Sequence, residues 1–345
     1  MNTNRSATSS PSRVWTDVDL DAVGRFEGYF RVPHSTHESG YGWIPIPFVS
    51  LKSGDDGPQV LLMAGNHGDE YEGQVMLRKL IRSLDLADVK GQIIILPAAN
   101  FPAVRAGRRT SPIDSGNMNR MFPGDPDGSP SQVIAHFIET ELIARVEYVF
   151  DFHSGGFSSE YLPLAHVIDD GNLERSRRAR EILEVFAMPI SVIVEGLGSG
   201  GAGGRLFGAC QRAGDVVHMS TELGGGGTVS LDSLVHAERG LARLLHHVGA
   251  IRRPLTDEVA PATTFYRRPP ARDFIYALQT GIFEPYVKLG EQVSAGQPAG
   301  AIHDLTAPWR EPLQVCFNDT GMVLSRRVPA RVEIGDYLFN LGMPQ

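Results

Sequence analysis

Two histidines and a glutamate are the residues of this sequence best suited to hold a metal ion. His67 and Glu70 lie three residues apart, directly after the apolar run 60–64, and His153 ends a second apolar run, 148–153. Ligands at the ends of two strands can face one point. Catalytic zinc takes three protein ligands of this kind and keeps a fourth position for water. The pattern therefore predicts a zinc site made by these three residues, although His-x-x-Glu alone is also common in solvated turns.

A further carboxylate, Glu222, ends the apolar segment 216–222 and is followed by the glycines 224–227. Hydrolysis at a metal needs a base that takes a proton from water without being a ligand itself. A glutamate at a strand end suits that role, and the glycines that follow it let neighbouring backbone come close. Taken alone, Glu222 is also consistent with a surface residue beside a flexible loop.

Arginines and asparagines are concentrated in one long loop, in the segments 105–109 and 117–124. Arginine binds a carboxylate through two parallel hydrogen bonds, which fixes orientation as well as charge. The loop is therefore predicted to hold an anionic substrate, while any single arginine in it could simply be solvated.

Composition indicates a soluble globular protein. The chain has 345 residues, 42% hydrophobic and 21% charged, with a formal charge of −8 that argues against nucleic-acid binding. No apolar run approaches the roughly 20 residues of a membrane span. The polar N-terminus lacks a signal core, so we expect a cytoplasmic location. Cys210 and Cys316 belong to no Cys-x-x-Cys pair, and no disulfide framework is expected.

Apolar strand-like runs alternate with amphipathic helical segments from about residue 59 to 248. The expected strands are 60–65, 92–98, 148–153, 164–168, 190–195 and 216–222, and the expected helices are 70–84, 129–145, 173–186 and 231–248. This order predicts an α/β fold with a mainly parallel sheet flanked by helices. Ligands on such sheets bind at the carboxyl ends of the strands, where His67, His153 and Glu222 fall.

Composition changes near residue 255 and suggests a domain organisation. We expect a flexible tail over 1–13, a hydrolase domain over 14–255 and a small all-β domain over 263–345. The segment 289–297 is similar to lipoyl and biotinyl carrier domains. It lacks the lysine that such domains modify, so modification is not expected.

The ordered motifs resemble those of the aspartoacylase and succinylglutamate desuccinylase family, part of the wider zinc carboxypeptidase fold. The resemblance covers nearly the whole chain and rests on His67, Glu70, Arg109, Asn119, Arg120, His153 and Glu222. It implies one zinc ion per chain, held by the two histidines and Glu70. It also implies Glu222 as general base and Arg109, or its neighbour Arg108, as the residue that polarises the scissile carbonyl. Asn119 and Arg120 are implied to grip a substrate carboxylate.

Within that family, the segments 65–74, 117–124 and 151–156 most resemble the deacetylases of ectoine degradation. The resemblance implies hydrolysis of N-α-acetyl-L-2,4-diaminobutyrate to 2,4-diaminobutyrate and acetate. Succinylglutamate desuccinylase, aspartoacylase and carboxypeptidase activities are the alternatives within the same chemistry. A non-catalytic zinc or small-molecule binding protein is an alternative of another class, although metal storage needs no free base such as Glu222. The sequence leaves a homo-oligomeric state open.

Several other polar residues could have roles at or near the site. Asp151 lies two residues before His153, so it could orient that histidine or be purely structural. His34 and His37 are expected to be solvated, and His166 and His218 to be hydrogen-bonded core residues. Tyr286 and Arg326 are candidates from the C-terminal region for the mouth of the site.

Overall fold

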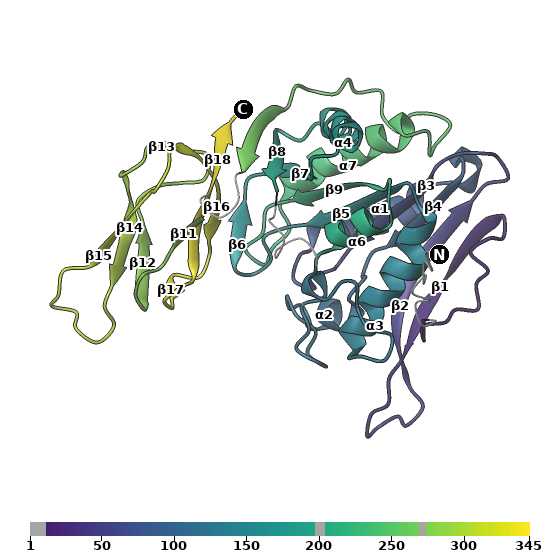
Figure 1. Ribbon diagram of the computed structural model, residues 1–345, viewed down its shortest axis with the longest axis horizontal. Helices are drawn as coiled ribbons and strands as arrows, with labels where there is room; N and C mark the ends of the chain where they lie inside the picture. Colours follow the sequence, from purple (N-terminus) through teal and green to yellow (C-terminus); the bar gives the residue numbers. More distant parts are fainter. Residues whose placement is uncertain (1–11, 197–203, 269–273) are drawn as a thin grey trace, which may run out of the picture.

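The structure is a computed structural model that describes residues 12–196, 204–268 and 274–345. Helices cover both faces of one large sheet, and a smaller β-rich region follows at the C-terminal side (Figure 1). The predicted tail 1–13 falls almost wholly outside the described residues. Among those described, no helix is long and apolar enough to cross a membrane.

Within the described residues the large sheet has 14 strands, and the candidate site residues lie at its middle. Along the sheet the order is β1-β2-β4-β3-β5-β9-β7-β8-β10-β18-β16-β13, with β11 beside β18 and β6 beside β16. The strands β3 (Gln59–Ala64), β4 (Gln92–Leu96), β5 (Tyr148–His153) and β9 (Val217–Glu222) run parallel. The predicted strands of this region are therefore confirmed.

The predicted α/β fold is confirmed, but the sheet as a whole is mixed rather than mainly parallel. The outer hairpin of β1 (Gly24–Pro33) and β2 (Trp43–Lys52) is antiparallel, and β2 is antiparallel to β4. On the other side, β7 (Leu164–Asp169) pairs antiparallel with β9. Beyond it, β8 (Ile190–Glu195) and β10 (Thr264–Arg268) run parallel to β7.

The reversal at β7 follows from the short connection that precedes it. A parallel return needs a crossover of about a dozen or more residues, usually a helix. The connection 154–163 carries only the short strand β6 (Ser159–Tyr161). The chain therefore returns antiparallel, and Leu164 at the start of β7 pairs with Glu222 at the end of β9. The change of strand direction therefore lies next to the end of β9 that carries Glu222.

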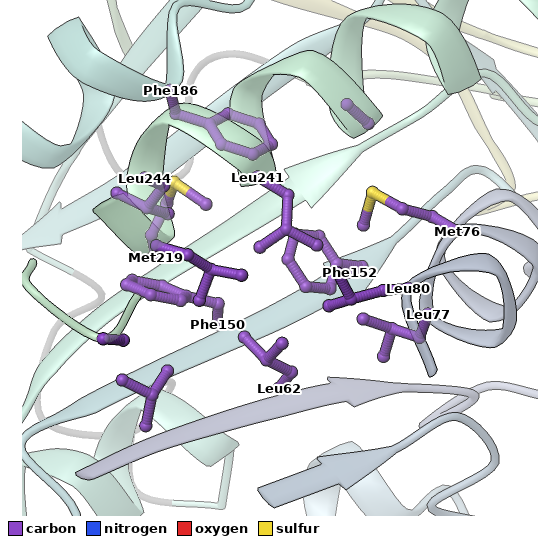
Figure 2. Packing of buried hydrophobic residues seen from close by; sticks show 14 of the residues in the cluster. Leu62, Met76, Leu77, Leu80, Phe150, Phe152, Phe186, Met219, Leu241 and Leu244 are labelled. Carbon is purple, nitrogen blue, oxygen red and sulfur yellow. The ribbon is translucent and has the colours of Figure 1, made fainter. Parts of the chain in front are cut away.

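One face of the sheet is closed by an apolar layer under α1 (Glu72–Ser83), α4 (Leu173–Phe186) and α7 (Leu231–His247). Figure 2 shows side chains from strands and helices meeting there: Leu62, Phe150, Phe152 and Met219 from the sheet, and Met76, Leu77, Leu80, Phe186, Leu241 and Leu244 from the helices. These three helices match the predicted segments. This layer is an apolar core, and the candidate site residues lie on the opposite face of the sheet.

The opposite face is covered by shorter helices. They are α2 (Phe101–Ala106), the 3₁₀ turn η2 (Met118–Arg120), α3 (Pro130–Phe137) and α6 (Leu206–Arg212), with smaller turns at Ile138–Leu142 and Ile143–Arg145. The turn Leu86–Asp88 lies on the other face, where Leu86 packs against the first layer. As predicted, α3 begins at Pro130, but it ends early because the backbone changes to a π turn at Ile138. Strand alternation sends Asp151 and His153 to this face, while Phe150 and Phe152 enter the core layer.

The C-terminal region is built from strands in its described part, 274–345. These are β11 (Phe274–Tyr276), β12 (Gly281–Pro285), β13 (Gln292–Val293), β14 (Pro298–His303), β15 (Leu313–Cys316), β16 (Gly321–Arg327), β17 (Arg331–Val332) and β18 (Tyr337–Pro344). Four of them form a separate sheet, β15-β14-β12-β17. The large sheet continues into this region, because β10 pairs with both β8 and β18 and β6 pairs with β16. C-terminal side chains can therefore reach the junction between β9 and β7.

Candidate active site

A cavity of about 450 Å³ lies over the junction of β9 and β7. Its floor is the sheet face that carries His153 and Glu222, and its walls come from η2, the start of α6 and the C-terminal strands. The residues predicted for metal, base and substrate all line it: His67, Glu70, Arg109, Asn119, Arg120, His153 and Glu222. Residues far apart in the sequence thus meet in one place.

Three buried side chains form a set that can hold a metal ion. The Nδ1 atom of His67 lies 2.7 Å from Glu70 Oε1, and Nδ1 of His153 lies 2.6 Å from Glu70 Oε2. Their ligand atoms all lie within 4.8 Å of one another. Each of the three residues is at most 6% exposed. Two imidazole nitrogens and one carboxylate, shielded from solvent, are a donor set that suits zinc.

The outer nitrogens of both histidines have acceptors of their own. Nε2 of His153 lies 2.7 Å from Asp151 Oδ2, which also accepts from Asn66 Nδ2 at 3.2 Å. Nε2 of His67 lies 3.1 Å from Asn117 Oδ1. Such outer acceptors fix the orientation of a metal-binding histidine and leave Nδ1 for the metal. Asp151 therefore contacts a predicted ligand directly, and Asn117 is a partner that sequence reasoning missed.

Charges within this cluster shift its pKa values in opposite directions. Burial alone would lower the pKa of His153, but the carboxylates of Asp151 and Glu70 outweigh it and hold that pKa well above its usual value. Burial would raise the pKa of Glu70, yet His67 and His153 keep it below its usual range. For His67, burial prevails and lowers the pKa. An ionised carboxylate thus lies between two imidazoles, which favours a cation at this point.

Glu222 lies beside the ligand set without belonging to it. It pairs in register with His153 across β5 and β9. Its Oε2 atom is buried and has no hydrogen-bond partner among the described residues. Burial, followed by the negative charge of Glu70, raises the pKa of Glu222 to about 8. A carboxyl group with a pKa near the working pH can both take and return a proton.

The glycines after Glu222 are required by close backbone contacts. Gly224 to Gly227 all have positive φ angles. A Cβ atom on Gly225 would lie 2.1 Å from the carbonyl oxygen of Ser159. The carbonyl oxygen of Gly224 accepts hydrogen bonds from the amides of Gly155 and Tyr161, both at 3.0 Å. The glycine run therefore fastens the end of β9 to the turn that follows His153.

Of the two adjacent arginines, the structure brings Arg109 to the site. Its Nη1 atom lies 3.3 Å from both His67 Nδ1 and Glu70 Oε1. The side chain of Arg108 does not line the cavity, and its carbonyl oxygen accepts from the amide of Gly68 at 2.8 Å. The guanidinium of Arg109 is therefore placed to meet negative charge that develops next to the ligand set.

A positively charged wall faces the ligand set across the cavity. Asn119 Oδ1 accepts from the amide of Leu206 at 3.1 Å, which ties η2 to the start of α6. Arg120 donates to the carbonyl oxygen of Asn119 at 2.7 Å. Its pKa is lowered to about 10 by partial burial and by the charges of Arg205 and Arg109. Arg205, which sequence reasoning missed, has a buried Nε atom without a partner among the described residues. An anion would relieve the repulsion among these arginines.

The C-terminal region reaches the cavity through residues other than those predicted. Tyr286 and Arg326 do not line it, and Arg326 instead pairs with Glu160 at 2.6 Å. The C-terminal residues in the wall are Arg268, Phe274, Tyr276 and Tyr337. These positions belong to no sequence motif. The pairing of β10 with β18 brings them to the cavity.

The structure contradicts the prediction for His166 and His218 and is consistent with the prediction for His34 and His37. His166 and His218 line the cavity, and His166 Nδ1 and both nitrogens of His218 lack hydrogen-bond partners among the described residues. The prediction of hydrogen-bonded core histidines is therefore wrong. Alternation along β9 places His218 on the same face as Glu222, four residues later. His34 and His37 are not part of the candidate metal set within the described chain.

Comparison with known proteins identifies the family of this chain. Residues 56–248 match the succinylglutamate desuccinylase/aspartoacylase catalytic domain, and the chain belongs to that family. The N-α-acetyl-L-2,4-diaminobutyric acid deacetylase of Halomonas elongata is 39% identical over 328 residues, 94% of each chain. A family structure from Rhodobacter sphaeroides has a TM-score of 0.90 and 34% identity, covering 97% of this chain and 99% of its own. The product-bound structure of the ectoine utilization protein EutE (DoeB) from Ruegeria pomeroyi gives the same four values. The relation to zinc carboxypeptidases stays a prediction.

Proposed function

We propose that this protein is a zinc-dependent hydrolase that removes acetate from N-α-acetyl-L-2,4-diaminobutyrate. The observation that carries the proposal is one cavity in which the set of His67, Glu70 and His153, the unpartnered carboxyl group of Glu222 and a cationic wall face each other. The similarity to a deacetylase of this substrate over 94% of the chain supports the choice of substrate. A cytoplasmic location and a homo-oligomeric state stay predictions.

One zinc ion per chain would be held by His67, Glu70 and His153, and their Nδ1 and carboxylate atoms fit it. When bound, zinc supplies a Lewis acid that polarises a carbonyl group and lowers the pKa of water to near 7. The outer contacts of Asp151 and Asn117 keep both imidazoles turned toward the shared centre.

The protein's own residues supply the remaining chemistry. Glu222 takes a proton from the attacking water and later delivers it to the departing amine nitrogen, as its raised pKa allows. Arg109 donates hydrogen bonds to the carbonyl oxygen as negative charge develops on it. Asn119 and Arg120, with Arg205 beside them, hold the α-carboxylate and so set its distance from the scissile amide.

A second candidate is the hydrolysis of an acyl amino acid with a second carboxylate, such as acetylaspartate or succinylglutamate. Arg205 and Arg268 favour it, because they add positive charge to the cavity beyond Arg120. A non-catalytic binding protein is disfavoured, because such a protein has no use for a buried, unpartnered carboxyl group at Glu222.

The test is a competition assay on purified, zinc-loaded protein. N-α-acetyl-L-2,4-diaminobutyrate, N-acetylaspartate and N-succinylglutamate are supplied at equal concentration, and each product amine is quantified over time. The proposal predicts that diaminobutyrate forms fastest. Faster release of aspartate or glutamate would establish the second candidate, and release of none of the three amines would favour the binding protein.

A further inference from the structure

The cavity floor contains a pair of histidines that the metal set does not use. His166 on β7 pairs in register with Ser220 on β9, and His218 lies two residues before Ser220 on the same face. His218 is 8% exposed, and neither of its ring nitrogens has a hydrogen-bond partner among the described residues. The Nδ1 atom of His166 also lacks one. Buried polar atoms without partners cost free energy, so such a pair is expected to serve a ligand.

Both imidazoles are held in the uncharged form. Burial lowers the pKa of His218 to about 4. Burial, followed by the positive charge of Arg268, lowers the pKa of His166 well below its usual value. A neutral imidazole carries one nitrogen that can only accept a hydrogen bond. The floor therefore offers two acceptors at neutral pH.

A carboxylate oxygen adds a third acceptor to this part of the cavity. Asp151 lies on β5, in register with Ser220, and its Oδ1 atom is buried without a partner among the described residues. Because His218 lies two residues before Ser220 in β9, Asp151 and His218 are neighbours on the same face of the sheet. The other oxygen, Oδ2, is already occupied by His153 and Asn66. The acceptors thus form a cluster at the sheet side of the cavity.

Arginines and hydrogen-bond acceptors of the cavity come from different elements, although Arg268 at the end of β10 also lines it and its positive charge acts on His166. Arginines 120 and 205 occupy the wall at η2 and α6, whereas the three acceptors occupy the sheet floor. Consider an acyl amino acid bound with its amide at the ligand set and its carboxylate at the arginines. Its side chain is then the one group without a binding partner. An ammonium group has three donors and no acceptor, so it matches the floor. A side-chain carboxylate would instead face the lone pairs of Asp151.

We propose that His218 and His166, with Asp151 behind them, form the subsite that receives the side-chain ammonium group of the substrate and determine specificity for a diamino acid. This inference rests on the proposed function and extends it to the residues that read the side chain. The rival ligand is a side-chain carboxylate bound by Arg205 and Arg268, and the experiment below separates the two.

The experiment compares two substrates that differ only in the side-chain amine, N-α-acetyl-L-2,4-diaminobutyrate and N-acetyl-L-2-aminobutyrate. In His218→Phe, the ring volume is kept and both nitrogens are lost. We expect kcat/KM for the diamino substrate to fall about 10- to 100-fold, the effect of a charge-assisted hydrogen bond. The value for the aminobutyrate substrate should stay unchanged. His218→Gln restores an acceptor and should recover part of the loss.

Zinc content and melting temperature are measured for each variant, and His166→Phe provides a second, independent test. Equal losses on both substrates would show a structural role and overturn the subsite. Unchanged discrimination in both phenylalanine variants would overturn it as well. A wild-type preference for N-acetylaspartate that His218→Phe leaves intact would establish the carboxylate reading.

A binding measurement keeps this inference separate from the proposed function. Calorimetry on the zinc-loaded protein compares L-2,4-diaminobutyrate with L-2-aminobutyrate, neither of which has an amide to hydrolyse. The subsite predicts about 10- to 100-fold tighter binding of the diamino acid, lost in His218→Phe. Equal affinities would overturn the subsite. Absence of acetate release from the diamino substrate would instead refute the proposed function, whatever the calorimetry shows.

Discussion

Replacement of Asp151 by asparagine tests how the metal set is oriented. The carboxylate of Asp151 is 1% exposed, and Oδ2 lies 2.7 Å from His153 Nε2 while accepting from Asn66 Nδ2. Asparagine keeps the shape but has one acceptor oxygen and an NH₂ group. If the oxygen faces His153, the negative charge that strengthens the imidazole as a ligand is lost. If the NH₂ group faces it, two donors confront each other. Either way the histidine is held less firmly.

The expected loss is set by what outer partners of metal-bound histidines contribute. It amounts to about 10- to 100-fold in zinc affinity, or roughly 1.4–2.7 kcal/mol. The assay is a zinc competition titration against a chromophoric chelator at fixed pH. Asp215→Asn is the matched control, because Asp215 is a surface carboxylate paired with Arg178. Unchanged zinc affinity in Asp151→Asn, measured on protein of wild-type melting temperature, would refute this account of Asp151.

Of three further predictions, two concern residues around the same centre and one concerns a half-buried aspartate between α2 and η2. Glu222→Gln cannot accept a proton, so turnover should fall about 10²–10⁴-fold with zinc content unchanged, and loss of zinc would instead make Glu222 a ligand. Arg120→Lys keeps the charge but loses the planar fork, so KM should rise for the free acid and change little for a substrate amidated at that carboxylate. Asp114 accepts from the amide and hydroxyl of Ser131 at 2.7 and 2.9 Å, and its pKa is lowered because these bonds, with others from the backbone, outweigh burial. Its stabilisation is therefore present above the unfolded pKa near 3.8 and is lost on acidification below it. The Asp114→Asn variant should melt at a lower temperature than the wild type at pH 7, and this difference in melting temperature should be smaller in acid. An equal difference at both pH values would contradict this.

The meeting of the candidate metal and base residues in one place could be predicted because their sequence signal is local. His67, His153 and Glu222 each follow or end an apolar run, and strands that lie side by side bring such ends together. The antiparallel direction of β7 relative to β9 could not be predicted from such a local signal. It depends on how the short connection 154–163 folds, and an apolar strand has the same sequence pattern in either direction.

The missed site residues fall into two groups. Asn117 contacts His67 from behind the ligand set and Arg205 lines the cavity, and only tertiary folding brings these two residues to the site. His218, in contrast, could have been found. It precedes Glu222 by four residues in one strand, and strand alternation places both on one face. The apolar character of the segment 216–219 concealed this, because it suggested a strand buried on both faces.

The central claim is that one zinc ion at His67, Glu70 and His153 is needed for deacetylation of N-α-acetyl-L-2,4-diaminobutyrate. The direct measurement is a zinc titration of chelator-treated protein, with acetate release followed at each step and His153→Ala titrated in parallel. The account predicts no activity without metal, a rise that ends at one zinc per chain, and neither binding nor activity in His153→Ala. Activity in the metal-free protein, or full zinc binding by His153→Ala, would contradict it.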